Sequence, residues 1–511
     1  MKLLVCFKVL TVPERVLQSD WDRFSLSADL GYAGMDFNCF DESALEMGLK
    51  IKQQAAVQGT EVLCTALTVS DSLPQDFAER LYSAGYDRVL QIPRKNREFC
   101  PELLAEILRE EGEAYDLILM GREAGMAETG MVPYLTAEAL GWPVLGHVEQ
   151  AGWEQGAVFT CRDDRGLWRI RGSLPMVCIA DNSPEVLRAA TLRQRMKVRG
   201  KQPERKDAQT ADLPVPEPCF KRPDTGRSCT MLDPESPETF RRIRKLLGES
   251  SGNGTESAGN LPVSEQLLQK LVYFPVSGDW DSEAVSCLQE TEKPLVILPD
   301  THEGRLLAAR LSAETGRSCC FGGELKKLWE TGAILEKRAF GSNLVWVREL
   351  QLPGVITVRN PEQYGISPRL PEGEKPACIL EKTLLEPWRA GALSQAKIVF
   401  VCGNGMGSKA GCDRVRVLAQ KFGAAVGLTR PAALNAWGSP GEILGQSGLQ
   451  IHPDCCLTLG AAGAGAFLLG VQGAKTLIAV NTDPNALIFK SADYGILMDA
   501  EKFMEKLGKE E

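Results

Sequence analysis

The chain has 511 residues, of which 44% are hydrophobic and 24% are charged, and its formal net charge is −9. This composition is ordinary for a folded globular protein, and the length exceeds what one hydrophobic core usually supports, so we expect three or four domains. The excess of acidic residues argues against a general nucleic-acid-binding protein.

Strands and helices alternate in the first part of the chain, from residue 1 to about residue 190. The apolar pattern predicts strands at 2–8, 61–69, 88–91 and 117–120, and helices at 41–54, 75–84 and 103–111. This alternation is typical of a parallel sheet covered by helices. The apolar N-terminus is interpreted as a buried first strand rather than a signal peptide, because charged residues follow from Lys8 onward and no cleavage site appears.

The composition changes between about residues 194 and 260, where prolines, serines, glycines and charges dominate. Such a stretch cannot bury enough apolar surface to order itself well. We expect an arm and a flexible linker, with a short helix at 237–247. A second α/β segment follows at about 267–371, with strands predicted at 271–275, 294–298 and 354–358 and a helix at 304–314.

The third α/β segment, from about residue 381 to residue 509, begins with a strongly apolar strand at 396–402. The turn Gly403-Asn404-Gly405-Met406-Gly407-Ser408 and a helix at 413–422 follow it. A strand, a glycine turn and a helix can direct backbone N–H groups toward an anion. The glycine spacing departs from the usual dinucleotide fingerprint, so the turn is either an anion-binding loop or only a tight turn.

Three further strands, at 424–428, 455–459 and 475–480, end in groups that can bind a ligand. The carboxyl ends of parallel strands meet at one edge of a sheet, where ligands bind. The mixture suits a long ligand with a diphosphate and a hydrogen-bonding heterocycle. Neither a serine-hydrolase elbow nor a phosphate-binding loop with its lysine is present. The residues at these ends are Thr429-Arg430, Gly445-Gln446-Ser447-Gly448, Gly460–Gly465 and Asn481.

Sixteen cysteines are present, but no Cys-x-x-Cys pair occurs and the histidines number only three. We interpret the cysteines as reduced core residues of a cytoplasmic protein without a metal site. The uncharged stretch at 455–474 is rich in glycine and alanine. It is therefore interpreted as a buried strand, a turn and a helix rather than a membrane span.

The residues at these positions resemble the electron transfer flavoprotein family. The C-terminal segment is similar to the FAD-binding domain of its alpha subunits, through Val426–Arg430, Gly445–Gly448, Ile478–Pro484 and Ile488–Gly495. The segment at 267–371 resembles the alpha subunit's N-terminal domain, through Thr301–Gly316 and Phe340–Leu344. The first 200 residues resemble a beta subunit, through Asn38–Glu46 and through Ala189–Arg193 followed by Lys197.

The resemblance implies an α/β fold in which a beta-like half precedes an alpha-like half. The expected segments are a beta-like domain at 1–193, a docking arm and flexible linker at 194–262, an alpha N-terminal-like domain at 263–375, and an FAD-binding domain at 376–511. The first and third would be parallel-sheet nucleotide-binding domains of the adenine nucleotide alpha hydrolase-like kind, and the last would be doubly wound. The usual heterodimer arrangement would then form within one chain.

The resemblance also implies roles for individual residues around one FAD. Thr429 and Arg430 would lie beside the flavin ring, where a hydroxyl can hydrogen-bond the ring edge and a cation stabilises a reduced, anionic flavin. The exposed Leu192 would anchor a partner, although it could instead pack on the neighbouring domain. The other expected FAD contacts are Gly403, Asn404 and Gly405 in the glycine turn, Gln446, Ser447 and Gly448 around the ring and ribityl chain, Gly463 near the diphosphate, Phe467 near the flavin carbonyl, and Asn481 and Asp493 at the nucleotide end.

The implied function is that of an electron carrier rather than a stand-alone enzyme. It would pass electrons from dehydrogenases of the acyl-CoA dehydrogenase type, as in fatty acid beta-oxidation, to an acceptor such as a quinone oxidoreductase. We expect a cytoplasmic protein with no transmembrane segment and no nucleic-acid partner.

Three residue differences from the family pattern bear on the ligands. Asn404 stands where the family usually has arginine, so one positive charge near the cofactor is missing. Phe467 stands where many members have a histidine near the flavin carbonyl, so we expect the loss of that donor to lower the potential. The loop at 121–130 is short and lacks its aspartate-rich centre, which makes AMP or a second FAD in the beta-like half doubtful. Asn38, Thr129 and Gly130 could contact such a nucleotide, or the loop could be purely structural.

Two alternatives to a one-FAD electron carrier remain. One is a bifurcating two-flavin protein that oxidises NADH, and the other is a non-redox adenine-nucleotide-binding module.

Overall fold

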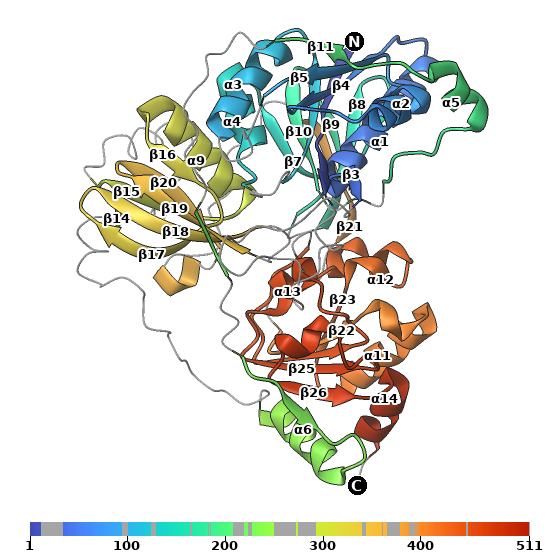
Figure 1. Cartoon of the computed structure of the whole chain (residues 1–511), viewed down its shortest axis with the longest axis vertical. Coiled ribbons are helices and arrows are strands. Elements are labelled where there is room, and N and C mark those ends of the chain that lie inside the picture. The colour runs from blue at the N-terminus through green and yellow to red at the C-terminus, as the bar shows by residue number, and fades with distance from the viewer. Residues whose placement is uncertain are drawn as a thin grey trace.

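The structure is a computed structural model, and four sheets of four or more strands, with their covering helices, organise its described residues (Figure 1). The described residues are 1–11, 34–94, 101–123, 129–163, 166–181, 183, 185–207, 219–222, 227–249, 272–273, 293–339, 344–359, 361–364, 379–387, 393, 396–445 and 448–509.

Ten strands form the N-terminal sheet, in the order β11-β5-β4-β1-β6-β10-β7-β8-β9-β21. The pairs from β11 to β7 are parallel, and β7, β8, β9 and β21 pair antiparallel. The strands are β1 (Lys2–Cys6), β4 (Leu63–Val69), β5 (Arg88–Ile92), β6 (Leu117–Gly121), β7 (Val144–Trp153), β8 (Ala157–Arg162), β9 (Gly166–Gly172), β10 (Met176–Ala180), β11 (Glu204–Arg205) and β21 (Ile379–Pro387).

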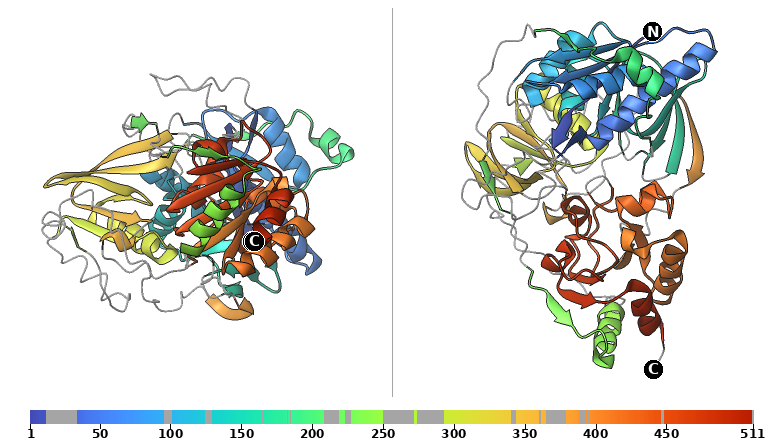
Figure 2. Two further views of the ribbon diagram at one scale, coloured as in Figure 1. Left: turned by 90° about the horizontal axis from the view of Figure 1, so that it is seen from below. Right: turned by 45° about the vertical axis from the view of Figure 1, so that its right-hand side comes forward.

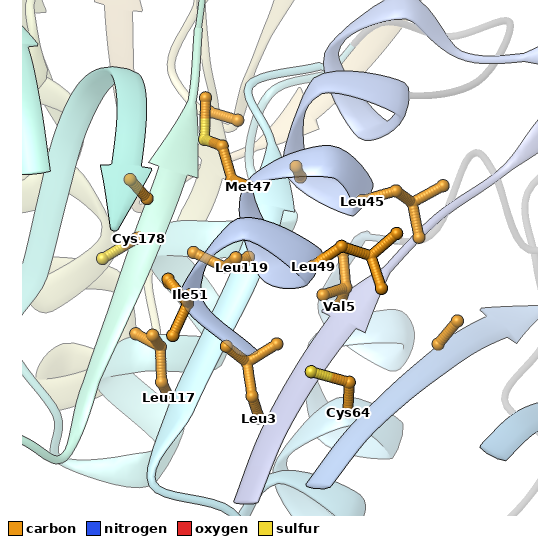
Figure 3. Close-up of a cluster of buried hydrophobic side chains, with 14 of the residues drawn as sticks. Leu3, Val5, Leu45, Met47, Leu49, Ile51, Cys64, Leu117, Leu119 and Cys178 are labelled. Carbon is orange, nitrogen blue, oxygen red and sulfur yellow. The ribbon is translucent and has the colours of Figure 1, made fainter. Parts of the chain in front are cut away.

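Helices cover both faces of the parallel part of this sheet. Leu3 and Val5 of β1 pack under α1 on one face, and Leu4 between them packs under α3 and α4 on the other. Figure 3 shows Leu45 and Leu49 of α1 over the first of these faces. The alternation follows from the two-residue period of a strand, and burial on both faces explains why β1 is continuously apolar. The elements beside this sheet are α1 (Cys39–Val57), α2 (Gln75–Ala84), α3 (Pro101–Gly112), α4 (Val132–Leu140), α5 (Leu192–Val198) and the β2 (Val9–Thr11)–β3 (Met35–Phe37) pair.

The second region combines a parallel sheet, β14-β15-β20-β16, with an antiparallel sheet, β12-β19-β18-β17. Helix α9 packs against α4, so Leu307 and Leu311 share one apolar core with the N-terminal sheet. The elements are β12 (Cys219–Lys221), β14 (Val272–Tyr273), β15 (Leu295–Pro299), α9 (His302–Thr315), β16 (Ser318–Cys320), β17 (Glu324–Trp329), β18 (Gly332–Ala339), β19 (Leu344–Gln351), β20 (Gly354–Val358) and the 3₁₀ helix η3 (Pro361–Tyr364).

The C-terminal sheet is parallel, with the order β13-β26-β25-β24-β22-β23. Helices α6, α11 and α14 pack on one face, and α13 with η6 packs on the other, so the sheet is doubly wound as the sequence predicts. The elements are β13 (Thr230–Leu232), α6 (Pro237–Glu249), β22 (Ile398–Cys402), η4 (Asn404–Met406), α11 (Lys409–Lys421), β23 (Ala425–Leu428), α12 (Arg430–Leu434), η5 (Pro440–Glu442), β24 (Cys455–Leu459), α13 (Gly465–Val471), β25 (Thr476–Asn481), η6 (Leu487–Lys490), β26 (Tyr494–Leu497) and α14 (Ala500–Gly508).

Two segments pack away from the region that their position in the chain suggests. Strand β13 and helix α6 fall in the stretch expected to be arm and linker, yet they belong to the C-terminal sheet. Arg244 of α6 donates to the backbone oxygens of Leu507 and Lys506 at 3.2 and 3.0 Å. Strand β21, within the range expected for the FAD-binding domain, instead extends the N-terminal sheet. The helix predicted at 237–247 is confirmed. Its apolar face is buried against the C-terminal sheet, and this packing stabilises the helix.

No helix among the residues described above is long and apolar enough to cross a bilayer. The thirteen cysteines in the described ranges are free thiols. Nine of them are buried in the apolar clusters, where cysteine packs as a small hydrophobe, and two more lie at the edge of a cluster. The exposed one is Cys219, in β12.

Candidate functional site

The candidate site lies at the carboxyl edge of the C-terminal sheet. In chain order its main strands are β22, β23, β24, β25 and β26, so their spatial order is 2-1-3-4-5. The loops after β22 and β24 leave the sheet toward opposite faces, because α11 and α13 pack on opposite sides. A crevice at such a switch point is the usual ligand position in open α/β sheets.

The glycine turn after β22 packs directly on the loop after β24. The amides of Gly403 and Gly405 donate to the carbonyl oxygens of Leu459 and Gly460 at 2.8 and 2.9 Å. A β-carbon at position 403 would lie 2.2 Å from the Gly460 oxygen, so only glycine fits there. Because its amides are used inside the protein, the turn supports the neighbouring loop.

The loop after β24 presents free amides instead. Within the described ranges, the N–H groups of residues 461–464 have no hydrogen-bond acceptor. Gly463 has a φ of +85°, and a β-carbon there would lie 2.1 Å from the Ile488 nitrogen. Asn481 at the end of β25 donates to the Ala461 oxygen at 2.8 Å and fixes the loop. Consecutive unpaired amides beside a helix start form an anion-binding site.

Thr429 and Arg430 lie at the end of β23, beside β22. The Thr429 amide donates to the Cys402 oxygen at 3.0 Å. The Thr429 side chain is 7% exposed, and its hydroxyl has no hydrogen-bond partner in the part of the chain that the structure describes. A buried hydroxyl without a partner is costly, so this atom is available to a bound ligand. Arg430 is half-buried at the start of α12.

The loop containing Gly445 and Gly448 packs against the start of α13. A β-carbon on Gly445 would lie 2.6 Å from the Ala466 oxygen. Phe467 is buried in the apolar cluster on this face and offers no hydrogen-bond donor. Gln446 and Ser447 lie outside the described residues.

Asp493 lies at the other edge of the sheet. It precedes β26, accepts a hydrogen bond from the Leu477 amide at 2.7 Å and forms an ion pair with Arg227. Its predicted contact with the nucleotide end of a ligand does not fit this position, because the ligand edge is at the other end of the strand. The acid that follows β26 at the ligand edge is Asp499, which caps α14 and accepts from the Glu501 amide at 3.0 Å. An aspartate directly before a helix was the sequence signal for it.

Two family models match the chain. Residues 31–211 match the electron transfer flavoprotein domain, and residues 392–472 match the electron transfer flavoprotein FAD-binding domain. The two matches together span about half of the chain.

The chain belongs to the electron transfer flavoprotein family.

The order of the two matches confirms the predicted arrangement, with the beta-like half first and the alpha-like half last. Protein FixB of Salmonella typhimurium (strain LT2) is 29% identical over 236 residues, which are 43% of this chain and 74% of that protein. Protein FixB of Escherichia coli (strain UTI89 / UPEC) is 28% identical over 225 residues, 42% of this chain and 72% of that protein.

The residues of this electron transfer flavoprotein fit an FAD on chemical grounds. The amides of residues 461–464 can bind the diphosphate, and the unpartnered Thr429 hydroxyl can bond a heteroatom of the flavin ring. The FAD-binding domain match covers both features. Asn404, at the position where the resemblance leads us to expect an arginine, is exposed and accepts a hydrogen bond from Asn435 at 3.1 Å.

A pocket of about 610 Å³, including its mouth, lies at the carboxyl ends of β1, β4 and β6. Thr129 and Gly130 line it, whereas Asn38 is not among its walls and donates to the Glu123 backbone oxygen at 2.8 Å. Asp41 accepts hydrogen bonds from the amides of Lys8 and Gly121 at 2.9 and 3.1 Å. Burial raises the pKa of Asp41 to about 7. Residues 124–128 of the shortened loop lie outside the described ranges.

Next to this pocket, buried charges lie on both sides of the boundary between the beta-like half and the alpha N-terminal-like region. Arg122 contacts Asp181 at 3.1 Å and Glu123 at 3.4 Å. On the facing side, Arg305 binds Asp300 through two hydrogen bonds of 2.7 and 2.9 Å. The electrostatic influence of Arg305 reaches Glu123. The sequence offered no signal for this network, because its members are far apart in the chain.

His302 at the start of α9 is half-buried and lies at the same boundary. Its Nδ1 lies 3.0 Å from the Tyr134 hydroxyl, and its ring packs edge-on against His147 at 5.7 Å. Burial and the charge of His147 lower the pKa of His302 to about 4.

We expect acid to destabilise the protein through His302. Its folded pKa lies below the unfolded value of about 6.5, so the unfolded state gains a proton first as the pH falls. Between about pH 6.5 and pH 4, the free energy of unfolding should fall by up to about 3 kcal/mol through this residue. In His302→Asn, urea unfolding over this range should show a slope smaller by up to one proton. An unchanged slope in His302→Asn would contradict the assignment.

Leu192 is the first residue of α5 and is 77% exposed. Thr191 and Gln194 form a reciprocal capping box that fixes the start of this helix. The side chain therefore projects from an ordered position rather than packing on a neighbouring domain.

Proposed function

We propose that this protein carries electrons on one FAD, bound at the carboxyl edge of its C-terminal sheet. The observation that supports this most is the buried Thr429 hydroxyl, which has no partner among the described residues and lies at the same edge of the sheet as the unpaired amides of residues 461–464. Gly403, Gly405, Gly448 and Gly463 shape the loops, and Asn481 orients the diphosphate loop.

The bound flavin supplies reversible acceptance and release of electrons. The residues of the chain would position the flavin ring and place charge beside it. Arg430 places a cation at the edge where negative charge develops on reduction, and Thr429 donates or accepts one hydrogen bond at the ring. Phe467 offers no donor, and Asn404 no charge, so we expect a lower potential than a histidine and an arginine would give.

The proposed partners are a dehydrogenase of the acyl-CoA dehydrogenase type as donor and an acceptor such as a quinone oxidoreductase, in the cytoplasm. Leu192 would anchor a partner, because it is an exposed apolar side chain among basic residues on a capped helix. The division of the chain at residues 193, 262 and 375 remains a prediction.

The test is the absorbance spectrum of the purified protein with quantification of released nucleotides. About one FAD per chain with little AMP supports the proposal. Two FAD would favour a bifurcating protein that uses NADH, with the second flavin in the pocket beside Thr129 and Gly130. A colourless protein that takes up no FAD would favour a non-redox adenine-nucleotide-binding module.

Thr429→Val tests the role of the hydroxyl. Valine keeps the shape, so we expect FAD to bind about two- to ten-fold more weakly through the loss of one hydrogen bond. The FAD-free protein should be no less stable, because an unpartnered buried hydroxyl is removed. Fluorescence titration with FAD and urea unfolding measure the two effects. The control is Thr476→Val. Thr476 is the first residue of β25 and so lies at the amino edge of the same sheet, away from the proposed ligand edge, and this variant should bind FAD as the wild type does. Unchanged affinity in Thr429→Val would refute the assignment.

A further inference from the structure

The short helix α12 is hydrogen-bonded at both of its ends to β22 and the glycine turn that follows this strand. At the start of the helix, the Thr429 amide donates to the backbone oxygen of Cys402, the last residue of β22, at 3.0 Å. At its end, Nδ2 of Asn435 donates to Oδ1 of Asn404 at 3.1 Å. Figures 1 and 2 show α12 at the end of the C-terminal unit that faces the N-terminal sheet. Two separate bonds therefore hold α12 at the carboxyl edge of its sheet.

The local sequence gives α12 little stability of its own. The helix spans Arg430–Leu434, and a helix of this length is marginal unless contacts outside it hold it in place. Ala436, shortly after the helix, has a φ of +58°, a left-handed conformation that alanine adopts only at a cost. The hydrogen bond from the Asn435 side chain therefore supports a backbone that local preferences disfavour.

The side chain of Asn404 is the polar group that the glycine turn offers to a ligand. The amides of residues 403 and 405–408 donate to backbone oxygens of the protein and are not available to a ligand. The Asn404 side chain is exposed, and among the described residues its one hydrogen bond is that accepted from Asn435. A carboxamide whose oxygen accepts a bond keeps two N–H donors. These donors are available to an acceptor on the ligand.

We propose that Asn435 is a positioning residue of the FAD site that acts through Asn404. Its donor selects the oxygen of the Asn404 carboxamide, which leaves the two N–H groups for the ligand. The same hydrogen bond fixes the helix that begins with Arg430, the cation at this edge. The role toward the ligand rests on the proposed function, whereas the link between the turn and the helix requires no flavin.

A double-mutant cycle on the full chain tests this proposal, with FAD affinity measured by fluorescence titration. Asn435→Ala loses one exposed hydrogen bond and should bind FAD about two- to five-fold more weakly. Asn404→Ala also loses the donors to the ligand and should bind about three- to ten-fold more weakly. The double variant should match Asn404→Ala within about two-fold, because Asn435 acts only through Asn404. Additive losses, or unchanged affinity in Asn435→Ala, overturn the proposal.

Leu434→Ala is the matched control. Leu434 precedes Asn435 on the same helix, its side chain is 52% exposed, and alanine favours a helix. This variant should bind FAD as the wild type does. A loss of affinity as large as that of Asn435→Ala would show that any change in α12 weakens the site, and the positioning role would be wrong.

Two further readouts separate the link from the ligand. Hydrogen–deuterium exchange in peptides covering 402–408 and 429–437 should be faster in Asn435→Ala than in Leu434→Ala, and unchanged exchange overturns the link. A less firmly held Arg430 should stabilise reduced flavin less, so the midpoint potential should fall in Asn435→Ala and not in Leu434→Ala. A potential that does not fall overturns the effect on Arg430. A protein that binds no FAD would sink the proposed function, and the exchange experiment would then decide the link by itself.

Discussion

Gly403→Ala is expected to abolish FAD binding and to destabilise the C-terminal unit by about 3 kcal/mol or more. The new β-carbon would lie 2.2 Å from the Gly460 oxygen and 2.4 Å from the Ala461 nitrogen. Both are backbone atoms, so no side-chain rotation relieves the clash. The loop after β24 would have to move, and with it the free amides proposed to hold the diphosphate. Urea unfolding and quantification of bound FAD measure the two losses.

The matched control is Gly248→Ala in α6 of the same unit. No atom lies within 4 Å of a β-carbon at this position, and alanine favours helix more than glycine does. This variant should keep its FAD and its stability. Retention of FAD in Gly403→Ala would mean that the contact between the two loops is not needed for the site.

Arg305→Leu should reduce the free energy of unfolding by about 3–5 kcal/mol, because it leaves the Asp300 carboxylate buried without its cation. Arg305 and Asp300 are almost fully buried and joined by two hydrogen bonds. Burial alone would raise the pKa of Asp300, but the charge of Arg305 holds it well below its usual value. Arg359 lies 3.8 Å from Asp300, too far for a hydrogen bond that could replace the lost ones.

The pH dependence gives this variant a distinctive signature. In the wild type, the depressed pKa of Asp300 contributes stability above its unfolded value of about 4, and this is lost as the pH falls through the folded pKa. In Arg305→Leu we expect the opposite direction, because a raised pKa favours the folded state at low pH. Urea unfolding at pH 4.5 and pH 7 should therefore show higher stability at the lower pH, relative to wild type.

Arg310→Leu on the same helix is the control. Arg310 is half-exposed and lies 3.6 Å from Glu314, a surface pair worth about 0.5 kcal/mol or less. Equal losses in Arg305→Leu and Arg310→Leu would show that the buried pair contributes nothing special to the boundary between the beta-like half and the alpha N-terminal-like region.

The sequence predicted most of the secondary structure of the parallel sheets. The strands at 354–358 and 455–459 and the helix at 75–84 occur with the predicted bounds. Their apolar periods are local, so they can be recognised without tertiary contacts. The antiparallel strands β7, β8 and β9 were not predicted. Polar and apolar residues alternate in them, and this pattern resembles a loop with short apolar runs more than it resembles the continuous apolar strands of a parallel sheet. Strand β21 and helix α6 were assigned to segments by chain order, whereas packing placed them elsewhere.

The same division holds for the candidate site. Because parallel strands share one carboxyl edge, the sequence alone placed Thr429, Gly463 and Asn481 together. It could not distinguish the two ends of a strand for a residue such as Asp493, which precedes β26 and so lies at the far edge. Which amides remain unpaired depends on hydrogen bonds between loops more than 50 residues apart, such as that from Gly403 to Leu459.

The sequence by itself determined the family and the order of the two halves, and it predicted the edge of the sheet at which we propose that a ligand binds, since these follow from local patterns and their spacing. Only the tertiary structure decided that the Thr429 hydroxyl is buried with no partner among the described residues, and that Arg305 and Asp300 are buried together. Burial and pairing depend on which distant segments pack side by side, and the free energies of charges and hydroxyls depend on burial far more than on neighbours in the chain.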